Sequence, residues 1–170
     1  IGNTTAAAAV SAALFGGDAE VWTGLGTGVD SETLERKKAA VDAARRRVEG
    51  EKPLEILRQV GGSELVAIAG AVSAARSRSI PVVLDGFVVS SACAVLEVIR
   101  PGALDHTVAG HCSAEPGHRL LLDKLGKPPI LDLAMRLGEA SGALAAVPLI
   151  RLAACCVTDV ATFGEWGLRR

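Results

Sequence analysis

The short apolar segment over residues 80–85 restricts the possible folds of this chain more than any other feature. It is rich in β-branched side chains, it is apolar on both faces, and it ends in Asp85-Gly86. A strand without polar alternation has to be covered on both sides, as central strands of parallel sheets are. Because parallel strands are joined by crossovers that usually contain a helix, the segment predicts a βαβ arrangement.

The second half of the chain carries the alternation that such an arrangement needs. After the strand over 80–85 we expect two further strands, the last of which could be a turn, and three helices. They are a helix over 90–99, a strand over 105–109 ending in Gly110-His111, a helix over about 115–125, a strand or turn over 130–133 and a long helix over about 142–163. This alternation predicts an α/β fold with a Rossmann-like parallel sheet flanked by helices.

The first half of the chain is predicted to be helical and contains no clear strand. Its expected helices start at capping residues or proline and stop at glycine, as helix ends commonly do. They run from Asn3 or Thr4 to about Phe15, from Asp30 or Ser31 to about Val48, from Pro53 to near Gly61-Gly62, and onward from Ser63. We expect these helices to form part of a small helical subdomain or an added layer beside the sheet.

Charge and cysteine usage exclude several classes of function. The formal net charge of −1 provides no basic field for nucleic acid. No apolar run reaches the length expected of a bilayer-spanning helix and no signal peptide is apparent, so a cytoplasmic protein without a membrane partner is expected. The four cysteines have neither zinc-site nor disulfide-framework spacing, which predicts buried free thiols in a reducing compartment. They are Cys93, Cys112, Cys155 and Cys156.

Two loops in the first half have the composition of anion-binding segments. Gly2-Asn3-Thr4-Thr5 offers hydroxyls and free helix N–H groups for a phosphate, although an ordinary N-cap explains it equally well. The segment Thr23-Gly24-Leu25-Gly26-Thr27-Gly28 lets the backbone approach a ligand closely. It is not a P-loop, and it lacks the strand and spacing of a dinucleotide fingerprint. Lys37, about two turns into the next helix, is placed to reach a phosphate unless it is simply solvated.

A third loop follows the second expected strand and reads Gly110-His111-Cys112-Ser113-Ala114-Glu115-Pro116-Gly117-His118. We reject a metal site here, because a turn and a proline separate the histidines and no third ligand lies nearby in sequence. The loop suits an oxyanion or a ribose, held by the Ser113 hydroxyl and backbone N–H groups. Since ligands of parallel sheets bind at the carboxyl ends of strands, Asp85-Gly86 is expected to meet this loop.

One acidic residue, Glu139, lies between glycines and small residues in an apolar stretch. A carboxylate that loses its hydration there has a raised pKa, which suits a general base near neutral pH. The alternative is an exposed glutamate at the start of the last helix, where the helix dipole favours a negative charge.

Taken in order, five segments resemble the nicotinate-nucleotide–dimethylbenzimidazole phosphoribosyltransferases, which make the lower-ligand nucleotide of cobalamin. The resemblance covers nearly the whole chain, and its most specific parts are the His-x-Ser-Ala-Glu-Pro-Gly-His and Leu-Gly-Glu segments. The five segments are Gly2-Asn3-Thr4-Thr5, the glycine loop 23–28, Pro81-Val82-Val83-Leu84-Asp85-Gly86, the loop 109–118, and Arg136-Leu137-Gly138-Glu139-x-Ser141-Gly142-Ala143.

The resemblance implies a reaction and a set of residues. Phosphoribose would pass from nicotinate mononucleotide to 5,6-dimethylbenzimidazole, giving α-ribazole 5′-phosphate and nicotinate, with no metal or organic cofactor. Glu139 would be the general base that takes the azole N–H proton, and Leu137 would line the pocket for the azole. The implied phosphate and ribose contacts are Gly2, Gly26, Lys37, Gly86 and Ser113, with Thr4 and Thr27 as weaker candidates.

The resemblance also implies that part of the site lies outside this chain. The sequence starts at Ile1 without a methionine, and family members are about twice as long, so residues 1–170 are expected to be the C-terminal portion of a single domain. The upstream half of the family supplies much of the azole pocket and a second acidic residue. The expected partners are therefore that N-terminal half and a second copy in a homodimer. Two alternatives stay open: a nucleotide-binding module without turnover, and a purely structural helical domain.

Overall fold

The computed structural model describes residues 3–24 and 31–168. In these residues three strands form one parallel sheet in the order β1-β2-β3. Strand β1 spans Val82–Leu84, β2 spans Thr107–Cys112 and β3 spans Pro129–Asp132. Helix α6 (Phe87–Ile99) connects the first two strands, and helix α7 (Pro116–Leu125) connects the second and third. The expected α/β fold class and parallel sheet are confirmed, and residues 130–132 lie in a strand rather than a turn.

Strand β2 is shifted along the chain relative to the expected 105–109: it starts two residues later, at Thr107, and extends to Cys112. Gly110 and His111 lie within it rather than after it, because β3 pairs with this part of the strand. His111 is in register with Leu131, and Cys112 with Asp132. Helix α6 also starts earlier than expected, at Phe87, directly after Gly86. With these bounds the carboxyl ends of the three parallel strands still lie at one edge of the sheet, where the connecting loops meet.

The helical half has the expected helices and one more. Their bounds are α1 Asn3–Phe15, α2 Ala19–Trp22, α3 Ser31–Arg47, α4 Pro53–Ile56, the π-helix η1 Leu57–Gly61 and α5 Gly62–Ser77. The short helix α2 was not expected from the sequence. The expected helix end near Gly61-Gly62 is confirmed, because η1 ends at Gly61 and Gly62 takes a non-helical φ of 75° at the boundary with α5.

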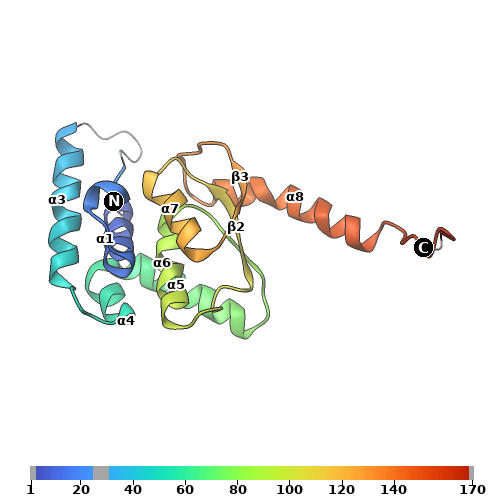
Figure 1. The fold of residues 1–170 in the computed structure, drawn as a ribbon, viewed down its shortest axis with the longest axis horizontal. Coiled ribbons are helices and arrows are strands. Elements are labelled where there is room, and N and C mark those ends of the chain that lie inside the picture. The colour runs from blue at the N-terminus through green and yellow to red at the C-terminus, as the bar shows by residue number, and fades with distance from the viewer. Residues whose placement is uncertain (1–2, 25–30, 169–170) are drawn as a thin grey trace.

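The two halves are joined by the packing of α1 against α6 (Figure 1). The middle of α1 is a run of buried alanines, and small side chains let two helix backbones approach closely. Ser91 of α6 donates a hydrogen bond to the Ala7 carbonyl at 3.0 Å and shares a 2.7 Å bond with Ser11. The alanine-rich sequence of α1 therefore holds the helical half directly against a crossover helix of the sheet.

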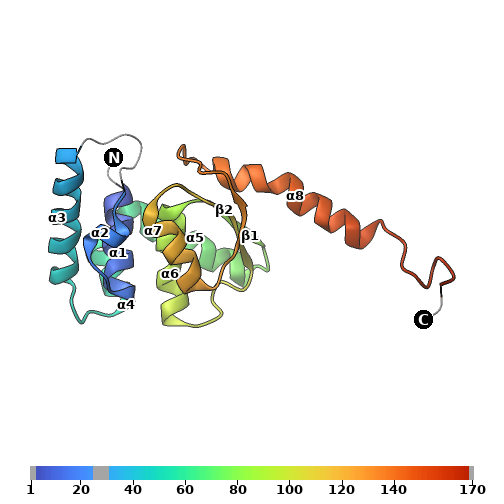
Figure 2. The same ribbon diagram turned by 45° about the horizontal axis from the view of Figure 1, so that its top comes forward.

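Helix α8 (Ser141–Thr158) leaves the rest of the fold (Figures 1 and 2). Its first turns pack on β2 and β3 through Gly142, Ala143 and Ala146, whereas the remainder is exposed. It ends five residues before the expected Phe163. By length and composition alone, α8 is long enough and apolar enough to cross a bilayer, and it is the one such helix among the described residues. The expectation that no apolar run reaches that length is therefore wrong.

The cysteines are free, as expected, but only two of them are buried. Cys93 and Cys112 lie in the core, whereas Cys155 and Cys156 are exposed on α8. The apolar sequence around the vicinal pair indicated burial, but α8 carries the pair away from the core of this chain.

A matched pair of leucine substitutions tests the assignment of the core. Leu121 in α7 is fully buried, and Leu54 in α4 is 62% exposed. Replacing Leu121 by alanine leaves a cavity and is expected to cost about 3 kcal/mol of unfolding free energy, against about 0.5 kcal/mol for Leu54→Ala. Urea unfolding of the two variants measures the difference, and equal losses would contradict the packing described.

Candidate active site

A cleft of about 1160 Å³ lies where the carboxyl ends of the strands face the helical half. Six of the residues singled out from the sequence line it, although they come from five separate segments of the chain. They are Thr4, Lys37, Gly86, Ser113, Leu137 and Glu139. The other three, Gly2, Gly26 and Thr27, lie outside the described residues. The cleft is at the edge of the sheet where ligands of parallel α/β proteins bind.

Lys37 forms the cationic centre of the helical wall. Its Nζ donates hydrogen bonds to Thr4 Oγ1 and to the Gly24 carbonyl, both at 3.1 Å. Burial lowers the pKa of the Lys37 ammonium, and the carboxylate of Glu115 opposes this shift. Since an ammonium has three N–H donors and these contacts use two, one donor remains for an anion in the cleft.

Gly24 allows this wall to meet the start of α7. A Cβ atom at Gly24 would lie 2.4 Å from Pro116 Cδ and 2.6 Å from Glu115 Oε2. Only glycine fits at this contact, and its carbonyl is the one that Lys37 holds. The first glycine of the loop therefore packs against protein, which the sequence did not distinguish from contact with a ligand.

His118 fixes the position of Ser113. The Ser113 backbone N–H donates to His118 Nδ1 at 2.9 Å, and because an N–H can only donate, Nδ1 is the unprotonated nitrogen. Nε2 then carries the hydrogen and donates to Ser90 Oγ at 3.1 Å. The Ser113 hydroxyl lies 3.0 Å from Nδ1, at the rim of the cleft. This network, which is buried on the Ser90 side and partly buried at Ser113, tethers the loop after β2 to α7 and α6.

Glu139 also lines the cleft, from the loop before α8. It is exposed in this chain, and Leu137 beside it is 73% exposed. Of the two interpretations of the sequence, the exposed glutamate before the last helix is the one found in this chain, because the apolar residues around it point to solvent or belong to the projecting α8. Gly138, Glu139 and Ala140 all have positive φ angles, of 74°, 54° and 61°.

The cleft also contains charged and polar residues to which the sequence analysis gave no individual role, although five of them lie in segments that it singled out. These are Asn3, Thr33, Arg36, Glu64, Asp85, His111, Glu115 and Arg136. Asp85 and His111 had a usable signal, since both stand at or near the carboxyl end of a strand. The others come from helices and loops whose neighbours are distant in sequence. Arg36, Lys37 and Arg136 give the cleft cations that suit a phosphate.

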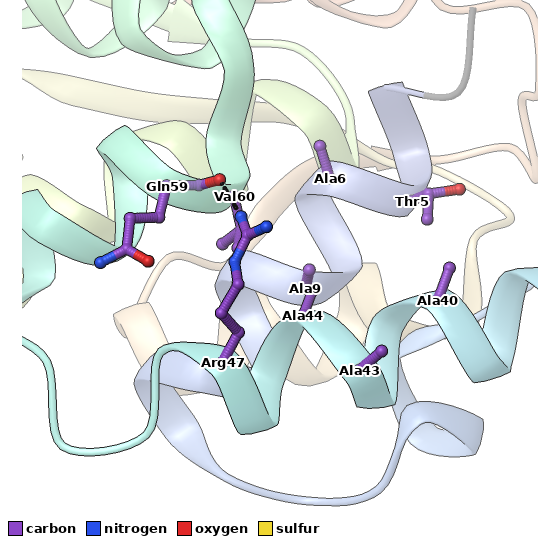
Figure 3. A pocket seen from close by; sticks show the side chains of 9 residues that line it. All are labelled: Thr5, Ala6, Ala9, Ala40, Ala43, Ala44, Arg47, Gln59 and Val60. Carbon is purple, nitrogen blue, oxygen red and sulfur yellow. Dashed lines mark hydrogen bonds between the residues drawn. The ribbon is translucent and has the colours of Figure 1, made fainter.

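The described residues contain no group of three His, Cys, Asp or Glu side chains placed to hold a metal ion. They do contain a second hollow of about 580 Å³ between α1, α3 and η1, lined mainly by alanine methyl groups (Figure 3). Its principal polar contact is a hydrogen bond from Arg47 to the Gln59 carbonyl. Convergent polar groups mark binding sites, and they gather in the larger cleft.

Comparison with known proteins gives one consistent result. A family model described as phosphoribosyltransferase, DBI_PRT, matches residues 1–168. A nicotinate-nucleotide–dimethylbenzimidazole phosphoribosyltransferase from Cereibacter sphaeroides is 55% identical over 170 residues, which are 99% of this chain and 50% of that protein. The protein of the same name from Brucella anthropi is 53% identical with the same coverage.

Solved structures agree with the sequence comparison. The crystal structure of CobT from Thermus thermophilus is 50% identical and superposes with a TM-score of 0.93. The match covers 100% of this chain and 51% of that one. The chain therefore spans about half the length of the relatives it matches.

The buried His118 predicts a specific pH dependence of stability. Burial, and next the neighbouring His111, lowers the pKa of His118 from 6.5 to about 4. The unfolded chain then binds the extra proton first, so unfolding free energy is lost as the pH falls from about 6.5 to 4, by roughly 3 kcal/mol.

The variant His118→Asn keeps an acceptor for the Ser113 N–H but does not titrate in this range. Urea unfolding at several pH values should show that it loses roughly 3 kcal/mol less than the parent over this interval. Parallel pH profiles for the variant and the parent would contradict the depressed pKa.

Proposed function

This chain belongs to the family of nicotinate-nucleotide–dimethylbenzimidazole phosphoribosyltransferases, and on that premise we propose that its cleft holds nicotinate mononucleotide for phosphoribosyl transfer to 5,6-dimethylbenzimidazole. The products are α-ribazole 5′-phosphate and nicotinate. One observation carries the proposal: Lys37, Ser113 and Glu139, which are far apart in sequence, line the same cleft at the carboxyl edge of the sheet.

The helical wall binds the phosphate. The buried ammonium of Lys37 is already oriented by Thr4 and the Gly24 carbonyl, so little conformational entropy is lost when its remaining donor meets a phosphate oxygen. Gly2, Gly26 and Thr27 are proposed to complete this phosphate site. Across the cleft, Gly86 and Ser113 face the ribose, and the Ser113 hydroxyl is held there by His118.

Glu139 accepts the proton that the reaction releases. One azole nitrogen attacks the ribose C1′ as the C1′–N bond to nicotinate breaks, and the bonding electrons leave with the nicotinate nitrogen. The N–H proton of the other azole nitrogen passes to the Glu139 carboxylate. Attack from the face opposite the leaving group converts a β-glycoside into an α-glycoside. Leu137 lies beside the base and is proposed to contact the apolar azole.

The remaining half of the protein is proposed to close the site. Exposure of Glu139 and Leu137 leaves the azole side open in this chain, and a base that works near neutral pH needs apolar surroundings. The N-terminal half and a second copy in a homodimer are the proposed cover. The free cysteines support a reducing compartment such as the cytoplasm.

The same exposure favours a second function for residues 1–170 taken alone. With the phosphate and ribose contacts present and the azole side open, this chain is proposed to bind the nucleotide without turnover. The two functions differ in a single readout, because only the transferase releases nicotinate when 5,6-dimethylbenzimidazole is added.

Substituting the proposed base tests the proton transfer. In the full-length protein, Glu139→Gln should lower kcat by about 100- to 10,000-fold while nicotinate mononucleotide binding is kept, because the amide has a similar shape but cannot take the proton. The exposed Glu35, which pairs with Lys38 away from the cleft, gives the control Glu35→Gln. Unchanged turnover in Glu139→Gln would remove Glu139 as the base.

Two adjacent lysines of α3 test the phosphate site. Lys37 lies in the cleft, whereas Lys38 pairs with Glu20 and Glu35 outside it. Calorimetric titration should show that Lys37→Ala weakens nicotinate mononucleotide binding by about tenfold or more and that Lys38→Ala leaves it unchanged, since a charge-assisted hydrogen bond is lost only in the first. Equal affinities in both variants would exclude Lys37 from the site.

A further inference from the structure

We propose that Asp85 is a positioning residue that anchors the start of helix α8 and thereby holds the loop carrying Glu139 over the cleft. The inference rests on the proposed function for its catalytic consequence. Its structural part, the anchoring of the loop, stands on contacts within this chain and can be tested without turnover.

The anchor is a buried hydrogen bond between residues 58 positions apart. The Ala143 backbone N–H donates to Asp85 Oδ1 at 2.9 Å, and Asp85 is only 7% exposed. The first N–H groups of a helix have no partner inside the helix, and a carboxylate acceptor also interacts favourably with the helix dipole. A hydrogen bond to a charged group in this position joins the end of β1 to the start of α8 more strongly than a neutral bond does.

The packing around this bond admits only glycine at position 142, in the first turn of α8. A Cβ atom at Gly142 would lie 2.0 Å from His111 Cδ2, and His111 is 2% exposed. His111 Nε2 in turn lies 3.4 Å from Asp85 Oδ1. Glycine at position 142 therefore lets the helix start lie against the imidazole, with the Ala143 N–H directed at the carboxylate.

The loop held by the anchor has a strained backbone. Glu139 and Ala140 both adopt left-handed conformations that non-glycine residues rarely take, and such conformations persist only where the surroundings enforce them. At the other end of the loop the Met135 carbonyl accepts a hydrogen bond from Ala114 N–H at 3.1 Å, next to Ser113. Glu139 is thus fixed between two tethers, one to the ribose side of the cleft and one to Asp85.

A second role for Asp85 would give different consequences. Its carboxylate lines the cleft, so it could instead stabilise positive charge at the ribose C1′ directly. Asparagine distinguishes the two roles, because its side-chain carbonyl still accepts from the Ala143 N–H but carries no charge. Alanine removes both the acceptor and the charge.

The test compares Asp85→Ala and Asp85→Asn in the full-length protein, by steady-state kinetics and by hydrogen exchange of the peptide covering 138–147. We expect Asp85→Ala to lower kcat by about 10- to 100-fold with little change in the KM for nicotinate mononucleotide, because a displaced base costs rate rather than affinity. Its 138–147 peptide should exchange faster. Asp85→Asn should restore most of the kcat and the protection.

Equal kcat losses in Asp85→Ala and Asp85→Asn, with protection of 138–147 unchanged in both, would overturn the anchoring role. If Asp85→Ala does not fold, as judged by circular dichroism, Gly142→Ala takes its place. Its added methyl group displaces the helix start from His111, so it should also lower kcat and speed exchange, and normal values in both would overturn the proposal. A parent protein without turnover would refute the transferase function, whereas faster exchange in Asp85→Ala would still support the anchor.

Discussion

The parallel pairing of three short strands is the constraint on which the site depends. With Leu84 in register with Ala109 and Cys112 with Asp132, the segments after all three strands emerge at one edge. Asp85-Gly86, Ser113 and the loop that carries Glu139 follow from this pairing rather than from their spacing in sequence. Strands apolar on both faces carry polar groups at their ends, and in parallel sheets the carboxyl ends are where ligands bind, so the pairing determines where a polar cleft forms.

The helical half supplies the opposite wall of the cleft through equally local causes. The buried alanines of α1 allow close packing on α6, and α3 packs against α1 with Lys37 directed at Thr4. The cleft thus combines a cationic wall from helices with hydroxyl, carboxylate and imidazole groups from the sheet edge. This division suits the proposed nucleotide substrate, whose phosphate and sugar need different contacts.

Most of the fold could be read from the sequence, whereas much of the site geometry could not. The strand over 80–85, the start of α1 and the proline that opens α7 follow from local propensity and capping. The bond between Asp85 and Ala143 joins distant segments, and no local pattern encodes it. The sequence left open whether Glu139 is exposed. The projection of α8 was missed because an apolar sequence indicates that a surface is covered, not which part of a protein covers it. Motif resemblance nevertheless selected six residues that the fold brings into one cleft.

The most direct test of the central claim is the identity and anomeric form of the reaction product. The full-length protein would be incubated with nicotinate mononucleotide and 5,6-dimethylbenzimidazole, and the nucleotide product separated by chromatography and its anomeric proton examined by nuclear magnetic resonance. The account predicts release of nicotinate together with α-ribazole 5′-phosphate, since inversion at C1′ follows from attack opposite the leaving group. Release of nicotinate with a β-configured product, or no product from the folded protein, would contradict it.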